Sequence, residues 1–273
     1  MTRVLKVSTP NAAFQRLDVL RRNRTKRRRH GEFLIEGVRA INAALAGGWS
    51  VRSLCYARGR SLSRWAVSVL ESSTSATRLE IEPGLFEQLT EKQEVPELLA
   101  VLAMKQDSLD RIRVGADMLI VIVDRPSNPG NLGTLIRSCD AFGADGVIVT
   151  GHGVDLYDPS VIRASVGSFF AVPCVALASH RDVAAWMAEL RRSYPELALV
   201  GTSAHASEAI RDFRWGKEVV LVVGNETDGL SHAYRELCES VVKIPMRGAP
   251  TSLNAAVAAS IVLYEIDSQR RAI

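Results

Sequence analysis

The chain has 273 residues, of which 47 % are hydrophobic and 23 % are charged, and this balance excludes an intrinsically disordered protein. No window approaches about 18 consecutive apolar residues, and no charged start precedes a short apolar run, so we expect neither a membrane span nor a secretory signal. The net charge of +4 conceals an asymmetry, because residues 1–30 carry a charge of +9 and the remaining residues carry −5.

A basic block at Arg21–Arg29 accounts for most of that asymmetry. Seven of its nine residues are Lys or Arg. Such a block attracts polyanions, because each phosphate that it neutralises releases counterions. We interpret it as an RNA-binding segment, although DNA, an anionic membrane, a solvated tail or a mitochondrial transit peptide would suit the same composition. The residues predicted to bind RNA are Arg21, Arg22, Arg24, Lys26, Arg27, Arg28 and Arg29.

Cysteine and histidine are scattered along the chain. The four cysteines and five histidines show no zinc-site spacing and no disulfide framework. We therefore expect reduced thiols packed as small apolar groups, no bound metal and a cytoplasmic protein.

The N-terminal part alternates between helical and strand patterns. Apolar residues at helical spacing predict a helix over 14–24 that runs into the basic block. Beyond it, short apolar runs alternate with helical patterns, as in a small α/β unit. The predicted strands are 33–35, 51–56, 78–81 and 98–104, and the predicted helices are 38–45, 62–70 and 83–89.

A second α/β unit follows a polar stretch that lacks core periodicity. We predict an N-terminal domain at 1–106, a linker at 107–116 and a C-terminal domain at 117–273. The C-terminal domain contains near-continuous apolar runs, which are typical of parallel strands buried on both faces. Helical segments between the runs predict a parallel sheet that is covered on both sides. The runs are 118–123, 146–149, 198–200 and 219–223.

The first candidate site segment, 124–137, follows the first of these strands. Asn128 is placed to cap a helix, and Pro129 suits its first turn. Leu132 belongs to the apolar face of that helix, and Arg137 lies about 140° around the helix axis from it, roughly opposite this face. A long cation at the carboxyl edge of a parallel sheet lies where α/β proteins bind ligands, although an ordinary surface arginine fits the same pattern.

Two further segments have a similar placement. After the strand 219–223, Gly224 lets a ligand approach the backbone, and Glu226 is placed either to orient a side chain or substrate or to cap a turn. The segment 241–254 precedes an Ala-rich helix for which Ser252 is a candidate cap or first-turn residue. That helix is small or apolar nearly all round, which indicates tight internal packing or a subunit interface.

Motifs of other nucleotide-binding enzymes and hydrolases are missing from the sequence. No GxGxxG follows a strand, and there is neither a GxxxxGK[ST] P-loop nor a GxSxG elbow. This argues against a nucleotide-binding enzyme of ordinary doubly wound topology.

Together, the three segments resemble the SpoU/TrmH family of RNA ribose 2′-O-methyltransferases, within the SPOUT superfamily, over about 117–266. Thr227 departs from the pattern, since the family often has glycine there. The N-terminal part resembles the family's small L30e-like substrate-binding domain. The matching positions are Asn131 and Arg137 in the first motif, Gly224, Asn225, Glu226 and Gly229 in the second, 244–246 and 252–254 in the third, and the intervening segment 157–167.

The resemblance implies a SPOUT α/β domain with a deep trefoil knot, a homodimer, and S-adenosyl-L-methionine bound in the knot. It implies methyl transfer to an RNA ribose 2′-hydroxyl, with ribosomal RNA favoured by the extra N-terminal domain. The implied catalytic residues are Arg137, Asn131, Glu226, Ser252 and Asn254, and the implied cofactor-binding residues are Thr202, Ser203, Gly224, Ile244, Met246 and Leu253.

Arg137 is the residue that we expect to act on the reacting atoms. Because arginine stays charged at neutral pH, we expect it to stabilise a developing alkoxide and to bind an adjacent phosphate, not to act as a base. Two alternatives stay open: tRNA as the substrate, and a non-catalytic RNA-binding protein that kept the fold.

Overall fold

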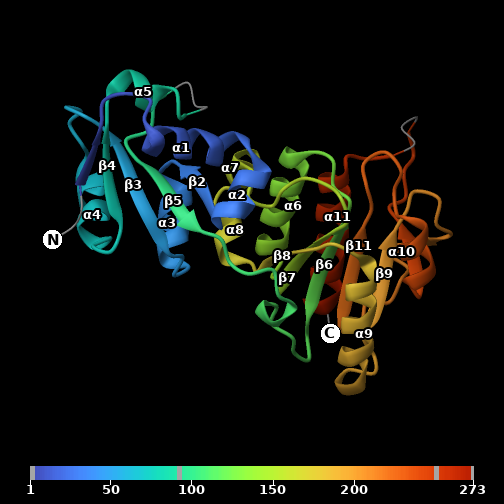
Figure 1. Cartoon of the computed structure of the whole chain (residues 1–273). Helices are drawn as coiled ribbons and strands as arrows, with labels where there is room; N and C mark the ends of the chain where they lie inside the picture. The colour runs from blue at the N-terminus through green and yellow to red at the C-terminus, as the bar shows by residue number, and fades with distance from the viewer. Residues whose placement is uncertain (1–3, 91–93, 249–251, 272–273) are drawn as a thin grey trace. The chain divides into compact units, whose positions relative to one another are not determined.

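The computed structural model describes residues 4–90, 94–248 and 252–271 (Figure 1). The chain divides into two compact units. Unit 1 consists of Met1–Lys105 together with Tyr157–Phe170, and unit 2 consists of Gln106–Leu156 together with Ala171–Ile273.

Unit 1 is built on a mixed sheet with the strand order β1-β4-β3-β5-β2. Strands β1, β4 and β3 are parallel, and β5 is antiparallel to both β3 and β2. The predicted alternation of strands and helices is confirmed, whereas β1 was not predicted. The elements are β1 (Val4–Val7), α1 (Ala12–Arg22), α2 (Arg24–His30), β2 (Glu32–Glu36), α3 (Val38–Ala46), β3 (Val51–Ala57), α4 (Arg64–Ser72), β4 (Thr77–Ile81), α5 (Pro83–Glu87), β5 (Leu99–Ala103), α7 (Pro159–Ser165) and α8 (Ser168–Ala171).

The prediction of one helix over 14–24 is wrong at its end. Helix α1 stops at Arg22, and the side chain of Asn23 accepts a hydrogen bond from Lys26 N (3.0 Å), which caps α2 as a separate helix. Gly31, with φ of 62°, ends α2 in the left-handed conformation that favours glycine. The basic block therefore spans two short helices.

An aromatic cluster explains why the segment 157–170 groups with unit 1. Tyr157, Phe169 and Phe170 from this segment pack with Phe33 and Trp49, and all five rings are buried. The centroids of Phe33 and Tyr157 lie 4.8 Å apart. Chain order alone does not predict this grouping.

Unit 2 is built on a parallel sheet with the strand order β10-β12-β9-β11-β6-β7-β8, and this confirms the predicted sheet type. Strands β8, β10 and β12 were not among the predicted runs. The elements are a 3-10 turn (Leu109–Arg111), β6 (Leu119–Asp124), α6 (Pro129–Ala141), β7 (Gly146–Thr150), β8 (Cys174–Leu177), α9 (His180–Ser193), β9 (Ala198–Thr202), β10 (Glu208–Ala209), β11 (Val219–Val223), α10 (His232–Leu237), β12 (Ser240–Lys243) and α11 (Ala255–Arg271).

Helices cover this sheet on both faces. Helices α6 and α11 lie side by side on one face, and α9 and α10 lie on the other (Figure 1). Ile112, only 4 % exposed, packs into the core beneath α9. Within the expected linker at 107–116, Ile112 thus belongs to the core of unit 2, whereas Val114 is exposed, and the linker itself stays a prediction.

The C-terminal part of unit 2 doubles back across the sheet. Strand β12 pairs with β9, yet α11, which follows it, packs against α6. Ile244 and Met246 line a cavity with residues at the carboxyl ends of β9 and β11, and Asn254, just before α11, lies beside Asn131 at the start of α6. Residues 249–251 lie outside the described residues. The third motif therefore lies beside the first, where Asn254 contacts Asn131.

Two further findings concern the described residues. None of the described helices has both the length and the apolar character needed to cross a bilayer. The four cysteines are free, and burial raises the pKa of Cys55 and Cys174 to about 12.

Candidate functional site

A cavity of about 550 Å³ opens at the carboxyl ends of β9, β11 and β12. The loops after these three strands and the first turns of α11 form its walls. Small and apolar side chains, including Ala255, Ala258 and Val262, line one side. Such a cavity suits a flat ligand that is recognised largely by backbone groups. All six residues predicted to bind the cofactor line it: Thr202, Ser203, Gly224, Ile244, Met246 and Leu253.

Gly224 is required for a reason that differs from the predicted one. A Cβ atom at this position would lie 2.3 Å from Gly229 C and 2.4 Å from Leu230 N. The space beside Gly224 is therefore filled by the backbone of its own loop, which folds back so that Asn225 and Gly229 exchange backbone hydrogen bonds of 3.0 Å. Glycine at 224 shapes the cavity wall before any ligand arrives.

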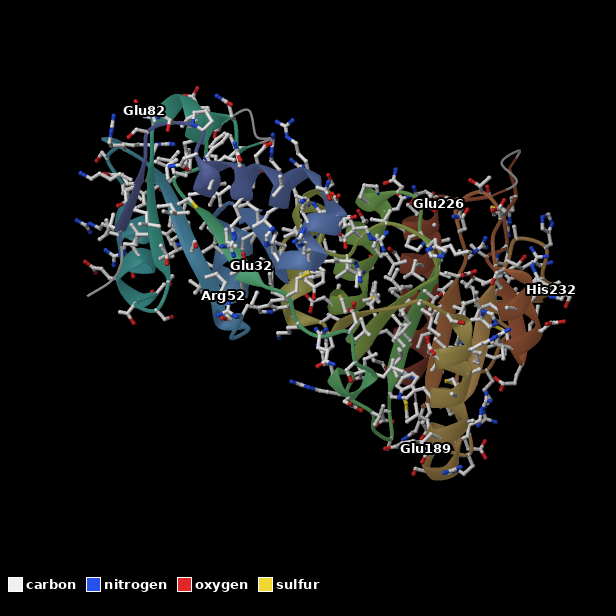
Figure 2. The ribbon with its side chains drawn as sticks, viewed as in Figure 1. Glu32, Arg52, Glu82, Glu189, Glu226 and His232 are labelled. Atoms are coloured by element: carbon white, nitrogen blue, oxygen red, sulfur yellow. The ribbon has the colours of Figure 1, made fainter. Side chains whose placement is uncertain are left out.

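Glu226 joins the loop after β11 to the start of α6. Its carboxylate accepts hydrogen bonds from Ser127 N (3.0 Å), Ser127 Oγ (2.7 Å), Asn128 N (3.3 Å) and Asn131 Nδ2 (3.1 Å). Figure 2 shows Glu226 beside α6 at this end of the sheet. Glu226 thus holds two loops together, as an orienting group would.

The charge state of Glu226 agrees with that role. Partial burial raises its pKa, but the hydrogen bonds from Ser127 and Asn131 outweigh this effect and hold the pKa below its ordinary value. Glu226 is therefore ionised at neutral pH and is a weak base. This geometry favours a positioning carboxylate over a proton acceptor.

Asn131 and Asn254 extend the same network to the third motif. Asn254 Nδ2 donates to Asn131 Oδ1 (2.9 Å), while Asn254 Oδ1 accepts from Ala256 N (3.0 Å) and caps α11. The cap is therefore Asn254, and the prediction of Ser252 as the cap is wrong. Ser252 instead lines the cavity. The predicted cap at the other helix is confirmed, because Asn128 Oδ1 accepts from Asn131 N (3.0 Å).

Arg137 lies apart from this network. It is exposed on α6 and does not line the cavity, and its side chain makes no hydrogen bond or ion pair with any described residue. The apolar face of the helix behaves as predicted, since Leu132, Leu135 and Ile136 are buried. The network fixes the N-terminal end of α6 and leaves the guanidinium available to another molecule.

The site also uses residues that sequence reasoning did not single out. Ser127 donates to Glu226, Arg125 O accepts from Asn225 Nδ2 (2.6 Å), and Asp228 and Arg235 line the cavity. All but Arg235 lie inside the motif segments already chosen. The partners of Ser127 and Arg125, however, lie 99 and 100 positions away in the chain, so sequence spacing offers no signal for either pairing.

The basic block divides into exposed and buried members. Arg27 is only 2 % exposed, and its guanidinium donates to Leu20 O (3.0 Å) and Arg21 O (2.9 Å) and pairs with Asp158 (3.4 Å). Its assignment as an RNA-binding residue is therefore corrected, because this side chain holds α1, α2 and α7 together. Arg21 is also largely covered, whereas exposed side chains remain at Arg22, Arg24, Arg28 and Arg29, with Lys26 partly exposed.

Known proteins resemble both parts of the chain. Residues 118–264 match the model of the SpoU rRNA Methylase family, and residues 11–100 match that of the SpoU L30e-like domain. The 23S rRNA (uridine(2479)-2′-O)-methyltransferase of Streptomyces viridochromogenes is 46 % identical over 266 residues, which cover 97 % of this chain and 92 % of that protein.

Two further matches agree with these. The 23S rRNA (guanosine(2553)-2′-O)-methyltransferase RlmP of Bacillus subtilis is 27 % identical over 88 % of this chain and 90 % of that protein. The crystal structure of the SpoU methyltransferase AviRb from Streptomyces viridochromogenes, in complex with the cofactor AdoMet, superposes with a TM-score of 0.92 at 46 % identity, covering 96 % of this chain and 98 % of that one.

Proposed function

Because this chain belongs to the SpoU rRNA methylase family, we propose that the cavity in unit 2 binds S-adenosylmethionine and that the residues around it carry out methyl transfer to RNA. The chain is an S-adenosylmethionine-dependent RNA ribose 2′-O-methyltransferase, and ribosomal RNA is favoured over tRNA as its substrate. The observation that supports our assignment of residues most strongly is the gathering of three separate loops around one cavity.

The cavity fits a nucleoside cofactor. Its walls combine backbone at Gly224 with small and apolar side chains such as Ala258 and Leu253. Thr202 Oγ1 donates to Val222 O (3.1 Å), and Ser203 N donates to Val242 O (3.0 Å), so the floor of the cavity is fixed in advance. When bound, S-adenosylmethionine supplies a methyl group activated by its sulfonium.

The residues of the network then have distinct tasks. Glu226 and Asn254 orient Asn131 and the start of α6, and Ser252 faces the cavity from the third motif. Arg137 stabilises the negative charge that develops on the ribose oxygen and binds the neighbouring phosphate, because a guanidinium provides several fixed donors. Holding the oxygen in line with the methyl group accounts for most of the remaining acceleration.

RNA selection follows from charge and chemistry. Only RNA offers a ribose 2′-hydroxyl. Arg24, Arg28 and Arg29 are exposed on α2 in unit 1, where they attract the phosphate backbone. With ribosomal RNA as the favoured substrate, we place the enzyme in the cytoplasm.

Assembly and topology are part of the same proposal. Val257 and Tyr264 are 48 % and 60 % exposed on α11, one heptad apart, and Leu253 is also exposed. Such an apolar stripe suits the predicted homodimer, and a monomer in sedimentation equilibrium would contradict it. The family fold, with Asn254 of the third motif beside Asn131 of α6, supports a trefoil knot. We retain 1–106, 107–116 and 117–273 as proposed functional divisions, with 107–116 packed in unit 2.

A transfer assay tests the proposal. The protein is incubated with S-adenosylmethionine carrying a labelled methyl group and with unmodified 23S rRNA, 16S rRNA or tRNA in separate reactions. We expect label in 23S rRNA that survives alkaline hydrolysis as a dinucleotide, because a 2′-O-methyl group blocks cleavage at that ribose. Label that appears in bases, or in tRNA alone, would contradict the proposal.

A further inference from the structure

Arg125, directly after β6, has a left-handed backbone conformation with φ of 51°. Among the described residues, Val166, with φ of 54°, is the other non-glycine residue with a positive φ. This conformation is unfavourable for any residue that carries a Cβ atom. It persists only where surrounding structure fixes it, and such strain clusters at functional sites.

Backbone hydrogen bonds fix the conformation of Arg125. Arg125 N donates to Thr150 O (2.9 Å) at the end of β7, and Arg125 O accepts from Asn225 Nδ2 (2.6 Å) in the loop after β11. The strained residue therefore joins the ends of three neighbouring strands. These bonds use backbone atoms of Arg125 and do not depend on its side chain.

The side chain of Arg125 contacts the loop that forms a wall of the cavity. Its Nη2 donates to Gly229 O (3.3 Å), and its Nη1 lies 3.8 Å from Asp228 Oδ2. Asp228 and Gly229 line the cavity, whereas Arg125 does not. The guanidinium therefore holds this wall from outside the cavity.

Gly151 leaves the space that the Arg125 side chain occupies. A Cβ atom at Gly151 would lie 2.8 Å from Arg125 Cγ. The left-handed turn at 125 and the missing side chain at 151 together direct the guanidinium toward the loop 225–229. The strained conformation of Arg125 thus lets its side chain hold the loop 225–229 in place.

We propose that Arg125 is a positioning residue that keeps the loop 225–229 in the conformation that binds S-adenosylmethionine. This inference rests on the proposed function and names a residue that sets cofactor affinity without touching the cofactor. It predicts a specific pattern: weaker cofactor binding, with the rate of methyl transfer at saturating cofactor nearly unchanged.

A purely structural role is the competing explanation. Asp124 is only 3 % exposed, and Arg125 Nε and Nη2 each lie 3.3 Å from its carboxylate. Removing the guanidinium alone would leave a buried carboxylate that keeps its hydrogen bond from Ser231 N (2.9 Å) but loses its cation. The test must therefore separate loss of this pair from loss of the contact with the loop.

The test compares the variant R125G with the double variant D124N/R125G. Glycine relieves the backbone strain, and the D124N change removes the buried charge while the new amide oxygen still accepts from Ser231 N. S-adenosylmethionine binding is measured by titration calorimetry, and the melting temperature is measured alongside. We expect both variants to bind the cofactor roughly tenfold more weakly, as loss of a charge-assisted hydrogen bond predicts. The double variant should melt no lower than the wild type.

Val166→Gly is the matched control. It relieves the same kind of strain in unit 1, at a residue that does not line the cavity, and should leave cofactor affinity unchanged. If D124N/R125G binds the cofactor as tightly as the wild type, Arg125 serves the buried pair alone and the inference is overturned. If the wild-type protein itself does not bind S-adenosylmethionine, the proposed function fails instead, so the two failures are distinguishable.

Discussion

Helix α2 of unit 1 carries several exposed basic side chains, among them Arg24, Arg28 and Arg29. In unit 2, by contrast, the single carboxylate of Glu226 accepts four hydrogen bonds from the loop and helix start at 127–131. The affinity of the first region for RNA depends on the number of its charges and little on their exact positions. The second depends on geometry, because each donor has one place in the network. We therefore expect single substitutions to have small effects in the first region and large effects in the second.

The largest expected effect comes from Arg137→Ala in unit 2. Methyl transfer should fall roughly a thousandfold, since removal of one donor to a developing oxyanion costs about that much. The Kd for S-adenosylmethionine should stay within about twofold, because Arg137 does not line the cavity. Single-turnover transfer and calorimetry measure the two quantities. Unchanged turnover would remove Arg137 from the reaction.

Arg27→Ala tests the comparison within α2, because Arg27 belongs to this basic helix but is buried and held by specific contacts. Its loss leaves two backbone carbonyls and Asp158 without their buried cation. We expect the free energy of unfolding to fall by about 3 kcal/mol. Arg28→Ala, on the same helix but exposed, is the matched control and should change it by less than about 0.5 kcal/mol. Equal stability of the two variants in urea titrations would contradict the buried role.

Glu226→Ala should produce an intermediate effect. Ser127 and Asn131 lose their acceptor, so the free energy of unfolding should fall by about 2 kcal/mol, and cofactor binding should weaken. Urea titration and calorimetry measure the two changes. Glu226→Gln, which keeps one acceptor oxygen, should lose less.

The lowered pKa of Glu226 also determines in which direction its contribution to stability changes with pH. A carboxyl group with a depressed folded-state pKa contributes stability that is present above its unfolded value and is lost as the pH falls through the folded value. The difference in stability between wild type and Glu226→Gln should therefore be constant from about pH 6 to pH 8 and shrink only below the ordinary pKa of 4.5. A difference that changes near pH 7 would show that Glu226 titrates there.

The smallest expected effect comes from the exposed arginines of α2. The double variant Arg28→Ala/Arg29→Ala should lower RNA affinity only a few-fold at moderate salt. Because each lost phosphate contact reduces the dependence of log K on log salt by about 0.7 to 0.9, loss of two contacts should lower the slope by about 1.4 to 1.8. Filter binding across salt concentrations measures it. A large loss of RNA affinity that does not depend on salt would mean that Arg28 and Arg29 make specific contacts with RNA, and would contradict the comparison.

The sequence predicted those parts of the fold that depend on local pattern. Buried parallel strands such as 219–223 appear as continuous apolar runs, and Asn128 is recognisable as a cap because capping is a local property. The positions of the site residues came from resemblance to a family. Their gathering around one cavity depends on contacts between distant segments, such as Asn254 with Asn131, that no periodicity reveals.

Other features were beyond sequence reasoning because they depend on partners far away in the chain. Arg27 looks like every other member of the basic block until Asp158 is placed beside it. Glycine at 224 suggests a close ligand, yet its neighbour is Gly229 of the same loop. The segment 157–170 joins unit 1 through aromatic packing with Phe33 and Trp49.

Hydrogen–deuterium exchange with and without S-adenosylmethionine tests most directly whether three separate loops bind one cofactor. We predict slower exchange at 202–205, 223–230, 244–246 and 252–258 of unit 2 on binding, because these segments line the cavity, and no change in α2 of unit 1. Protection confined to one loop, or protection that appears mainly in α2, would contradict the account.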